Sequence, residues 1–132
     1  MTADELIKQA RALIRERYKK EGHHSVVAAA LLTKSGKVFL ALNAGTNQPS
    51  IATCAEIIAI GMANTDDPHM EIDLIGAVRD REAYVISPCG KCREYITDYG
   101  PHARVIVPAD NTKGYKVVKA TDLLPNKYQK KA

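Results

Sequence analysis

Runs of residues that favour β-strands alternate along this chain with runs of helical periodicity, and this alternation restricts it to an α/β fold. The first two β-prone runs, residues 25–32 and 37–42, are joined by Thr33-Lys34-Ser35-Gly36, which favours a hairpin turn. Further strands are expected at residues 72–79, 83–86, 105–107 and 115–118, the second of these as a short strand or hairpin arm. Because a hairpin is combined with strands that helices separate, we expect a mixed sheet in an α/β sandwich.

Three segments have apolar residues at helical spacing: residues 4–19, with an end expected near Gly22, residues 54–64 and residues 89–99. The third is followed by Gly100-Pro101, a strong helix terminator, and residues 121–125 predict a short helical turn. With 132 residues and 45% hydrophobic composition, the chain has enough apolar surface for one compact core. We therefore expect a single domain over residues 1–132.

The formal net charge of +4 is concentrated at the two ends of the chain. Twelve of the nineteen Lys and Arg residues lie in residues 1–20 and 113–132, and acidic side chains outnumber basic ones in between. Proteins that bind nucleic acid usually have a basic stripe interleaved with aromatic residues, whereas aromatic residues are 5% of this chain and Trp is absent. The charge pattern therefore argues against a nucleic-acid partner.

The chain also lacks the sequence features of membrane and secreted proteins. Its longest apolar run, residues 26–32, is far shorter than the ~20 residues of a membrane span. Its first residues do not show the basic start, apolar stretch and cleavage site of a signal peptide. We expect a cytoplasmic protein with no membrane partner.

All three cysteines lie in two short motifs, each at the start of an expected helix. Cys54 stands in Thr53-Cys54-Ala55-Glu56, and Cys89 and Cys92 bracket Gly90-Lys91. An odd number of cysteines disfavours a disulfide framework, while helix N-termini favour thiolates and positions i and i+3 share a helix face. Three sulfurs suit tetrahedral Zn²⁺ and leave one position for water, as in catalytic zinc sites.

Glu56 is the residue expected to use that water. Positions i and i+2 of a helix point in different directions, so Glu56 is not expected to bind the metal that Cys54 holds. It is expected to act as the catalytic proton carrier, moving a proton from the water to a substrate nitrogen and then to a departing amine. Arg93 and the two helix dipoles are expected to offset part of the negative charge of the thiolates.

Each motif also has a simpler interpretation. Thr53 and Glu56 have the spacing of a capping box, and Cys89 and Cys92 resemble a redox dithiol, although that leaves Cys54 unexplained. The cysteines are also compatible with buried small hydrophobic residues. A structural zinc site needs a fourth ligand, and no histidine has a ligand-pair spacing with a cysteine; the histidines are His23, His24, His69 and His102. The two motifs together favour catalytic zinc.

The two motifs resemble those of the cytidine deaminase superfamily, in its three-cysteine zinc class and closest to blasticidin S deaminase-like members. The resemblance extends over roughly residues 25–128, through residues 25–31, 35–39 and 122–128. It implies a five-stranded mixed sheet between helices, in a three-layer α/β/α sandwich. It also implies one Zn²⁺ per subunit and a homotetramer, with a dimer as the alternative.

The implied reaction is the hydrolytic deamination of an amino-pyrimidine, such as cytidine, deoxycytidine or blasticidin S, with release of ammonia. In such enzymes the backbone N–H at Ala55 reads the pyrimidine carbonyl, and the carbonyl at Ser87 accepts a hydrogen bond from the amine. Asn43 matches the asparagine that contacts the sugar. The resemblance also implies substrate contacts for Ser25, for Arg81 if the alignment has a gap, and for Tyr128.

The chain departs from the cytidine-specific pattern at positions that bear on the substrate. Gly45 replaces the glutamate that follows the sugar-binding asparagine, Ile57 replaces an arginine, and Ser25-Val26 replaces an aromatic-Pro pair. Glu94 replaces a glutamine, and the C-terminal Trp of blasticidin-type enzymes is absent after Tyr128. Another free amino-heterocycle, bases in nucleic acid and a non-catalytic zinc-binding module therefore stay as alternatives.

Overall fold

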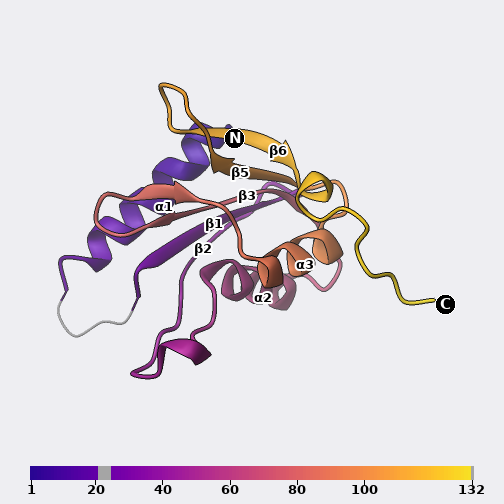
Figure 1. Cartoon of the computed structure of the whole chain (residues 1–132), viewed down its shortest axis with the longest axis horizontal. Helices are drawn as coiled ribbons and strands as arrows, with labels where there is room; N and C mark the ends of the chain where they lie inside the picture. Colours follow the sequence, from indigo (N-terminus) through magenta and orange to yellow (C-terminus); the bar gives the residue numbers. More distant parts are fainter. Residues whose placement is uncertain (21–24, 132) are drawn as a thin grey trace.

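A mixed six-stranded sheet lies between α1 on one face and α2 and α3 on the other in the computed structural model, which describes residues 1–20 and 25–131 (Figure 1). The strands are β1 (Val27–Thr33), β2 (Val38–Leu42), β3 (Ile72–Arg79), β4 (Tyr84–Ile86), β5 (Arg104–Pro108) and β6 (Tyr115–Lys119). The helices are α1 (Ala3–Arg17), α2 (Ala55–Asp66) and α3 (Gly90–Tyr99), with two 3₁₀ turns, η1 (Pro49–Ile51) and η2 (Ala120–Leu123). The predicted three-layer α/β/α sandwich is confirmed.

Five strands form the width of the sheet in the order β2-β1-β3-β5-β6, and β4 pairs with β3 outside that path. The pair β3–β5 is parallel and the other pairs are antiparallel. The parallel partner β5 meets the first half of β3, at Leu74 and Ile75, and β4 meets the second half, from Ala77. The predicted mixed sheet of five strands is therefore extended by one short strand, which is the one expected at residues 83–86.

The sheet has one apolar cluster on each face because side chains alternate along its strands. Leu74 and Val78 of β3 pack with α1, whereas Ile75 packs with α2 and α3. Ala77 packs with Ala55 at the start of α2. Odd-numbered residues of β3 therefore point to the face on which both cysteine motifs lie.

The first helix is shorter than predicted. A capping box between Thr2 and Glu5 begins α1, and its backbone ends at Arg17 with Tyr18 as the C-cap, two residues before the predicted end of the segment. The last buried residue of α1 is Ile14, so little apolar packing would stabilise a further helical turn. The expected end near Gly22 lies outside the described residues.

The start of α1 is fastened to the far edge of the sheet by polar contacts. The carboxylate of Asp4 accepts hydrogen bonds from the Tyr115 hydroxyl and, at 2.9 Å, from the Lys113 ammonium. That edge strand, β6, also carries two exposed lysines, Lys116 and Lys119. No helix of the described segments is long and apolar enough to cross a membrane.

Candidate metal centre

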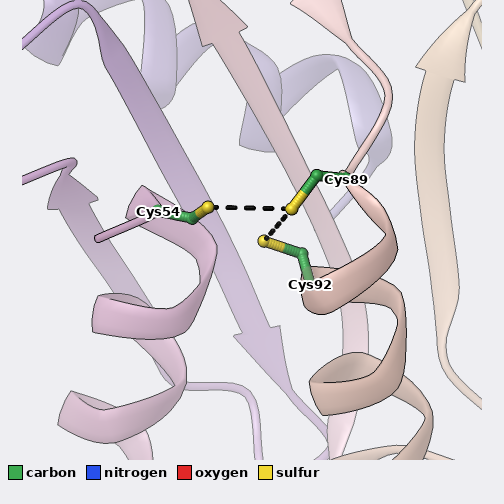
Figure 2. Close-up of side chains that lie close together, drawn as sticks. All are labelled: Cys54, Cys89 and Cys92. Atoms are coloured by element: carbon green, nitrogen blue, oxygen red, sulfur yellow. Dashed lines mark hydrogen bonds between the residues drawn. The ribbon is translucent and has the colours of Figure 1, made fainter. Parts of the chain in front are cut away.

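The three cysteine sulfurs meet where the first turns of α2 and α3 converge. Cys54 is the N-cap of α2, Cys89 is the N-cap of α3, and Cys92 lies in the first turn of α3 (Figure 2). The sulfurs of Cys54 and Cys89 are 3.7 Å apart, those of Cys89 and Cys92 are 3.4 Å apart, and all three lie within 4.8 Å of one another. Sulfurs bound tetrahedrally at about 2.3 Å from Zn²⁺ are roughly 3.8 Å apart, so the cluster fits this ion.

Backbone contacts position both helix starts. Ala44 and Thr53 form an isolated antiparallel bridge, with N···O distances of 3.0 and 2.9 Å, directly before Cys54. The guanidinium of Arg93 donates from Nε to the carbonyl of Pro88 at 2.9 Å and from Nη1 to that of Leu123 at 3.1 Å. Arg93 therefore ties the start of α3 to the segment before it and to the end of η2.

Glu56 is buried in the first turn of α2 but does not cap the helix. The helix begins at Ala55, and neither Thr53 nor the N-cap residue Cys54 supplies a side-chain capping bond. Glu56 is therefore the second helical residue and not the third, so the capping-box interpretation is wrong. Its side chain is only 5% exposed, and burial raises the pKa of its carboxyl against the opposing effect of its own backbone N–H.

The thiols have different environments. Burial raises the pKa of Cys54, and burial together with the nearby Glu56 raises that of Cys92. Burial also acts to raise the pKa of Cys89, but its hydrogen bonds with the backbone N–H of Cys92, the thiols of Cys92 and Cys54, and the backbone N–H of Lys91 together lower that pKa. Cys89 is exposed, whereas Cys92 is fully buried.

A cavity of about 630 Å³ opens beside the sulfurs, within the usual range for small-molecule sites, ~300–1,000 Å³. Of the predicted site residues, Asn43, Cys54, Ala55, Glu56, Ser87 and Cys89 line it. Cys92 is fully buried and belongs to the sulfur cluster but does not line the cavity. These residues come from two helix starts and from the ends of β2 and β4, so the fold brings the core of the predicted site together.

The other predicted contacts lie at different distances from this cavity. Ser25 lies beside it, because its hydroxyl donates to the carbonyl of Asn43 at 2.8 Å. Arg81 does not line it and instead lies over the ring of Tyr18, 5.6 Å from the centroid. Tyr128 is 78% exposed in the C-terminal segment and also does not line it. The roles of Arg81 and Tyr128 stay predictions.

Sequence reasoning missed Arg79, which lines the cavity. The signal was present in the alternation of the predicted strand at residues 72–79, because Arg79 shares the parity of Ile75 and Ala77, which point to the cysteine face. His69 and His102 are exposed, as expected, and do not belong to the sulfur cluster. His23 and His24 lie outside the described residues.

Comparison with known proteins gives one family. Residues 1–108 match the family described as "Cytidine and deoxycytidylate deaminase zinc-binding region". The chain is 38% identical to blasticidin-S deaminase of Bacillus cereus, over 94% of this chain and 90% of that protein. It is 25% identical to cytidine deaminase of Mycoplasma genitalium, over 95% and 94% of the two chains.

Solved structures agree with this assignment. The crystal structure of cytidine deaminase from Burkholderia pseudomallei has a TM-score of 0.76 and 32% identity, covering 97% of this chain and all of that one. The enzyme from Mycobacterium leprae has a TM-score of 0.75 and 25% identity, over 96% and 99%. Because family match, sequence relatives and structure agree, this chain belongs to the zinc-binding cytidine and deoxycytidylate deaminases, hydrolases of C–N bonds.

Proposed function

We propose that this protein deaminates a free amino-pyrimidine nucleoside, converting the ring amine to an oxo group with release of ammonia. The observation that carries the proposal is the buried carboxyl of Glu56 beside three sulfurs at the wall of a cavity of nucleoside dimensions. Cytidine, deoxycytidine and a cytosine nucleoside such as blasticidin S are the proposed substrates. The 38% identity to a blasticidin-S deaminase supports the last of these.

Cys54, Cys89 and Cys92 would hold the zinc ion, which supplies an activated water as the nucleophile when it is bound. Glu56 would take one proton from that water and deliver it to the ring nitrogen next to the reacting carbon. It would then deliver the second proton to the amine, so that ammonia leaves and a carbonyl remains. A carboxyl whose pKa is raised by burial suits both steps, because it is a stronger base than an exposed carboxylate and still returns the proton to the substrate.

The substrate would be oriented by groups that line the cavity. The backbone N–H of Ala55 is in the first turn of α2, where helical N–H groups have no partner within the helix, so it suits the pyrimidine carbonyl. The carbonyl of Ser87 would accept from the amine. Oδ1 of Asn43 accepts hydrogen bonds from the backbone N–H groups of Val26 and Val27, at 2.8 and 2.9 Å. The amide N–H₂ of Asn43 would therefore donate to a sugar hydroxyl.

We also propose that the chain is a single domain that acts in the cytoplasm as a homotetramer. Three thiols gathered in one cluster suit a reducing compartment. The outer face of α2 presents apolar residues, including the exposed Met62, which a second copy of the chain would cover. Arg81 and Tyr128 would contact substrate only within such an assembly, since neither lines the cavity of one chain.

The decisive variant is Glu56→Gln, which removes the proton carrier and retains every sulfur. Ammonia release from cytidine, deoxycytidine and blasticidin S should fall by roughly 10²- to 10⁴-fold in kcat, because general acid–base catalysis contributes about that much. The matched control is Glu71→Gln, which changes an exposed glutamate paired with Lys34 and should leave kcat unchanged. Full turnover by Glu56→Gln, with zinc content and fold intact, would refute the assigned role.

A further inference from the structure

The cavity has two charged side chains in its lining besides the cysteines, Glu56 and Arg79. Glu56 is buried beside the sulfurs and is committed to the chemistry proposed above. Arg79 is half-exposed, at the last position of β3. It lies on the same strand face as Ala77, which packs against Ala55, and two strand residues span roughly 6.5 Å. The cation therefore stands beyond the reacting end of the cavity, toward its rim.

The guanidinium of Arg79 has no firm protein partner. Its Nε lies 3.7 Å from Oδ1 of Asp80, which is too long for a hydrogen bond. The Asp80 carboxylate instead accepts from the hydroxyls of Tyr18, at 3.3 Å, and Tyr84, at 3.2 Å. Among the residues that the structure describes, none accepts a hydrogen bond from this guanidinium, although the group carries five N–H donors.

A structural role does not account for this arginine. An exposed ion pair such as Arg79–Asp80 contributes little to stability, typically ~0–1 kcal/mol. Its neighbour Arg81, by contrast, is held over the Tyr18 ring and does not line the cavity. The two arginines of this turn are therefore differently placed, and only Arg79 faces the space where a substrate would lie.

Arg79 and Asn43 lie on opposite sides of the same strand. The backbone N–H of Asn43 donates to the carbonyl of Val27 at 3.1 Å, and Val27 is in register with Arg79 on its other side. Because neighbouring strands are ~4.8 Å apart, the two backbones are separated by roughly 10 Å. A ligand whose ring points to Glu56 thus meets a neutral amide on one side and a cation on the other, and Gly45 adds no side-chain acceptor to the rim.

We infer that Arg79 is a specificity-determining residue that selects amino-pyrimidine substrates bearing an anionic group, a carboxylate or a phosphate, on the part remote from the ring amine. The inference rests on the proposed deaminase function. A guanidinium with free N–H groups binds either anion through two parallel hydrogen bonds, which an ammonium does not reproduce. The anion would replace the missing protein acceptor and neutralise the cation at the rim.

The test compares three substrates with the zinc-loaded enzyme: cytidine, cytidine 5′-monophosphate and cytidine 5′-carboxylic acid. The unmodified enzyme should have a higher kcat/KM for at least one anionic substrate than for cytidine. Arg79→Ala should lower kcat/KM for that substrate by roughly 10- to 100-fold, chiefly through KM, and change that for cytidine less than threefold. Arg79→Lys should recover only part of the lost kcat/KM, because lysine restores the positive charge but not the two parallel N–H donors of the guanidinium.

Two comparisons make the result decisive. Arg104→Ala removes a similarly exposed arginine of β5, beside the first half of β3, whose Nη2 lies 3.5 Å from Oδ1 of Asp73. This variant should not change kcat/KM for any of the three substrates. An advantage for the phosphate or for the carboxylate identifies which anion the site takes. Equal losses on neutral and anionic substrates in Arg79→Ala, or no advantage for either anion in the unmodified enzyme, would overturn the inference.

Failure of the proposed function gives a separate result. Absence of ammonia release from all three substrates counts against the deaminase proposal and leaves the role of Arg79 to be decided by binding. Calorimetry with the same three compounds then measures the dissociation constants. The inference is supported if an anionic compound binds more tightly than cytidine and Arg79→Ala removes that difference. It is rejected if the dissociation constants are the same in the variant and the unmodified protein.

Discussion

Cys92 and Cys89 contribute to the structure in different ways. Cys92 is fully buried between α3 and the sheet, so it packs as a core residue whether or not a metal is bound. Cys89 is exposed, and its sulfur lies 3.7 Å from that of Cys54 and 3.4 Å from that of Cys92. Zinc bound by all three would join the first turns of two helices that are distant in the sequence. The stabilisation that zinc provides should therefore be measurable separately from the stabilisation that the buried thiol of Cys92 provides by packing.

Cys89→Ala isolates the contribution of the metal. Zinc content should fall well below one ion per chain, and Tm should fall by more than about 5 °C, because metal binding is coupled to folding. With zinc removed from both proteins by a chelator, their Tm values should agree within about 2 °C, because an exposed substitution changes stability little. Atomic absorption and thermal unfolding measure both quantities.

Cys92→Ala provides the contrast within the same cluster. Because its thiol is fully buried, this variant should be less stable than the unmodified chain even without zinc. If Cys89→Ala kept full zinc occupancy, the three-sulfur site would be wrong.

At the scale of the elements, α1 is attached to the sheet by a polar clamp as well as by apolar packing. Asp4 accepts from Tyr115 and Lys113 of the β6 region, and Arg11 donates from Nε to the carbonyl of Ala83 at 3.0 Å. The hydrogen bond from Tyr115 and the ammonium of Lys113 hold the pKa of Asp4 below its ordinary value. The charged carboxylate is therefore favoured by folding.

This clamp should weaken in acid. A depressed folded pKa contributes stability above the ordinary value of about 4, and the contribution is lost as the pH falls through the folded value. The difference in unfolding free energy between the unmodified protein and Asp4→Asn should therefore shrink between roughly pH 5 and pH 2. Urea denaturation across this range measures it. The exposed Asp110→Asn should give a small difference that does not change with pH, and a constant difference for Asp4→Asn would contradict the clamp.

The sequence predicted most elements because their periodicity and terminators agree with the tertiary packing. The helix starts at Cys54 and Cys89 were predicted within one residue, and both are N-caps. The end of α1 was not, because Tyr18 carries no helix-breaking signal and its conformation depends on tertiary contacts such as that to Asp80. A contact between residues so far apart in the sequence cannot be predicted from local sequence patterns.

The candidate site was predictable where its chemistry is carried by unusual residue types. Three cysteines and Glu56 were identified and are brought together. Arg79 was missed because a charged residue at the end of a strand is normally exposed: the alternation of the strand gives its face, but the pairing with Val27 that brings it to the cavity is a tertiary contact. Thr53-x-x-Glu56 shows the opposite problem, since a capping pattern is present while the helix begins one residue later.

At the scale of the whole molecule, α2 has an outer face that is unusually apolar for an exposed helix. Ala59, Ile60 and Ala63 point into the core, whereas Ile58 is half-buried and Met62 is 43% exposed. A helix that is apolar on all sides is normally covered on all sides. This face supports the proposed association of several copies of the chain.

Met62→Arg should disrupt that association. Light scattering after size exclusion should give about four times the 14.4 kDa of one chain for the unmodified protein and a smaller mass for the variant, because a buried unpaired charge is costly. Ala12→Arg places the same charge on the exposed side of α1 and should leave the mass unchanged. A monomeric unmodified protein would refute the proposed assembly.

The lysines of β6 limit how such copies can meet. The free backbone N–H and C=O groups of an outermost strand are a template on which foreign strands can add, a common origin of fibrous aggregation. Lys116 and Lys119 place two ammonium groups along this border, so a like strand from another molecule would bring the same charges into repulsion. Lateral extension of the sheet by a second chain is thereby discouraged along this border.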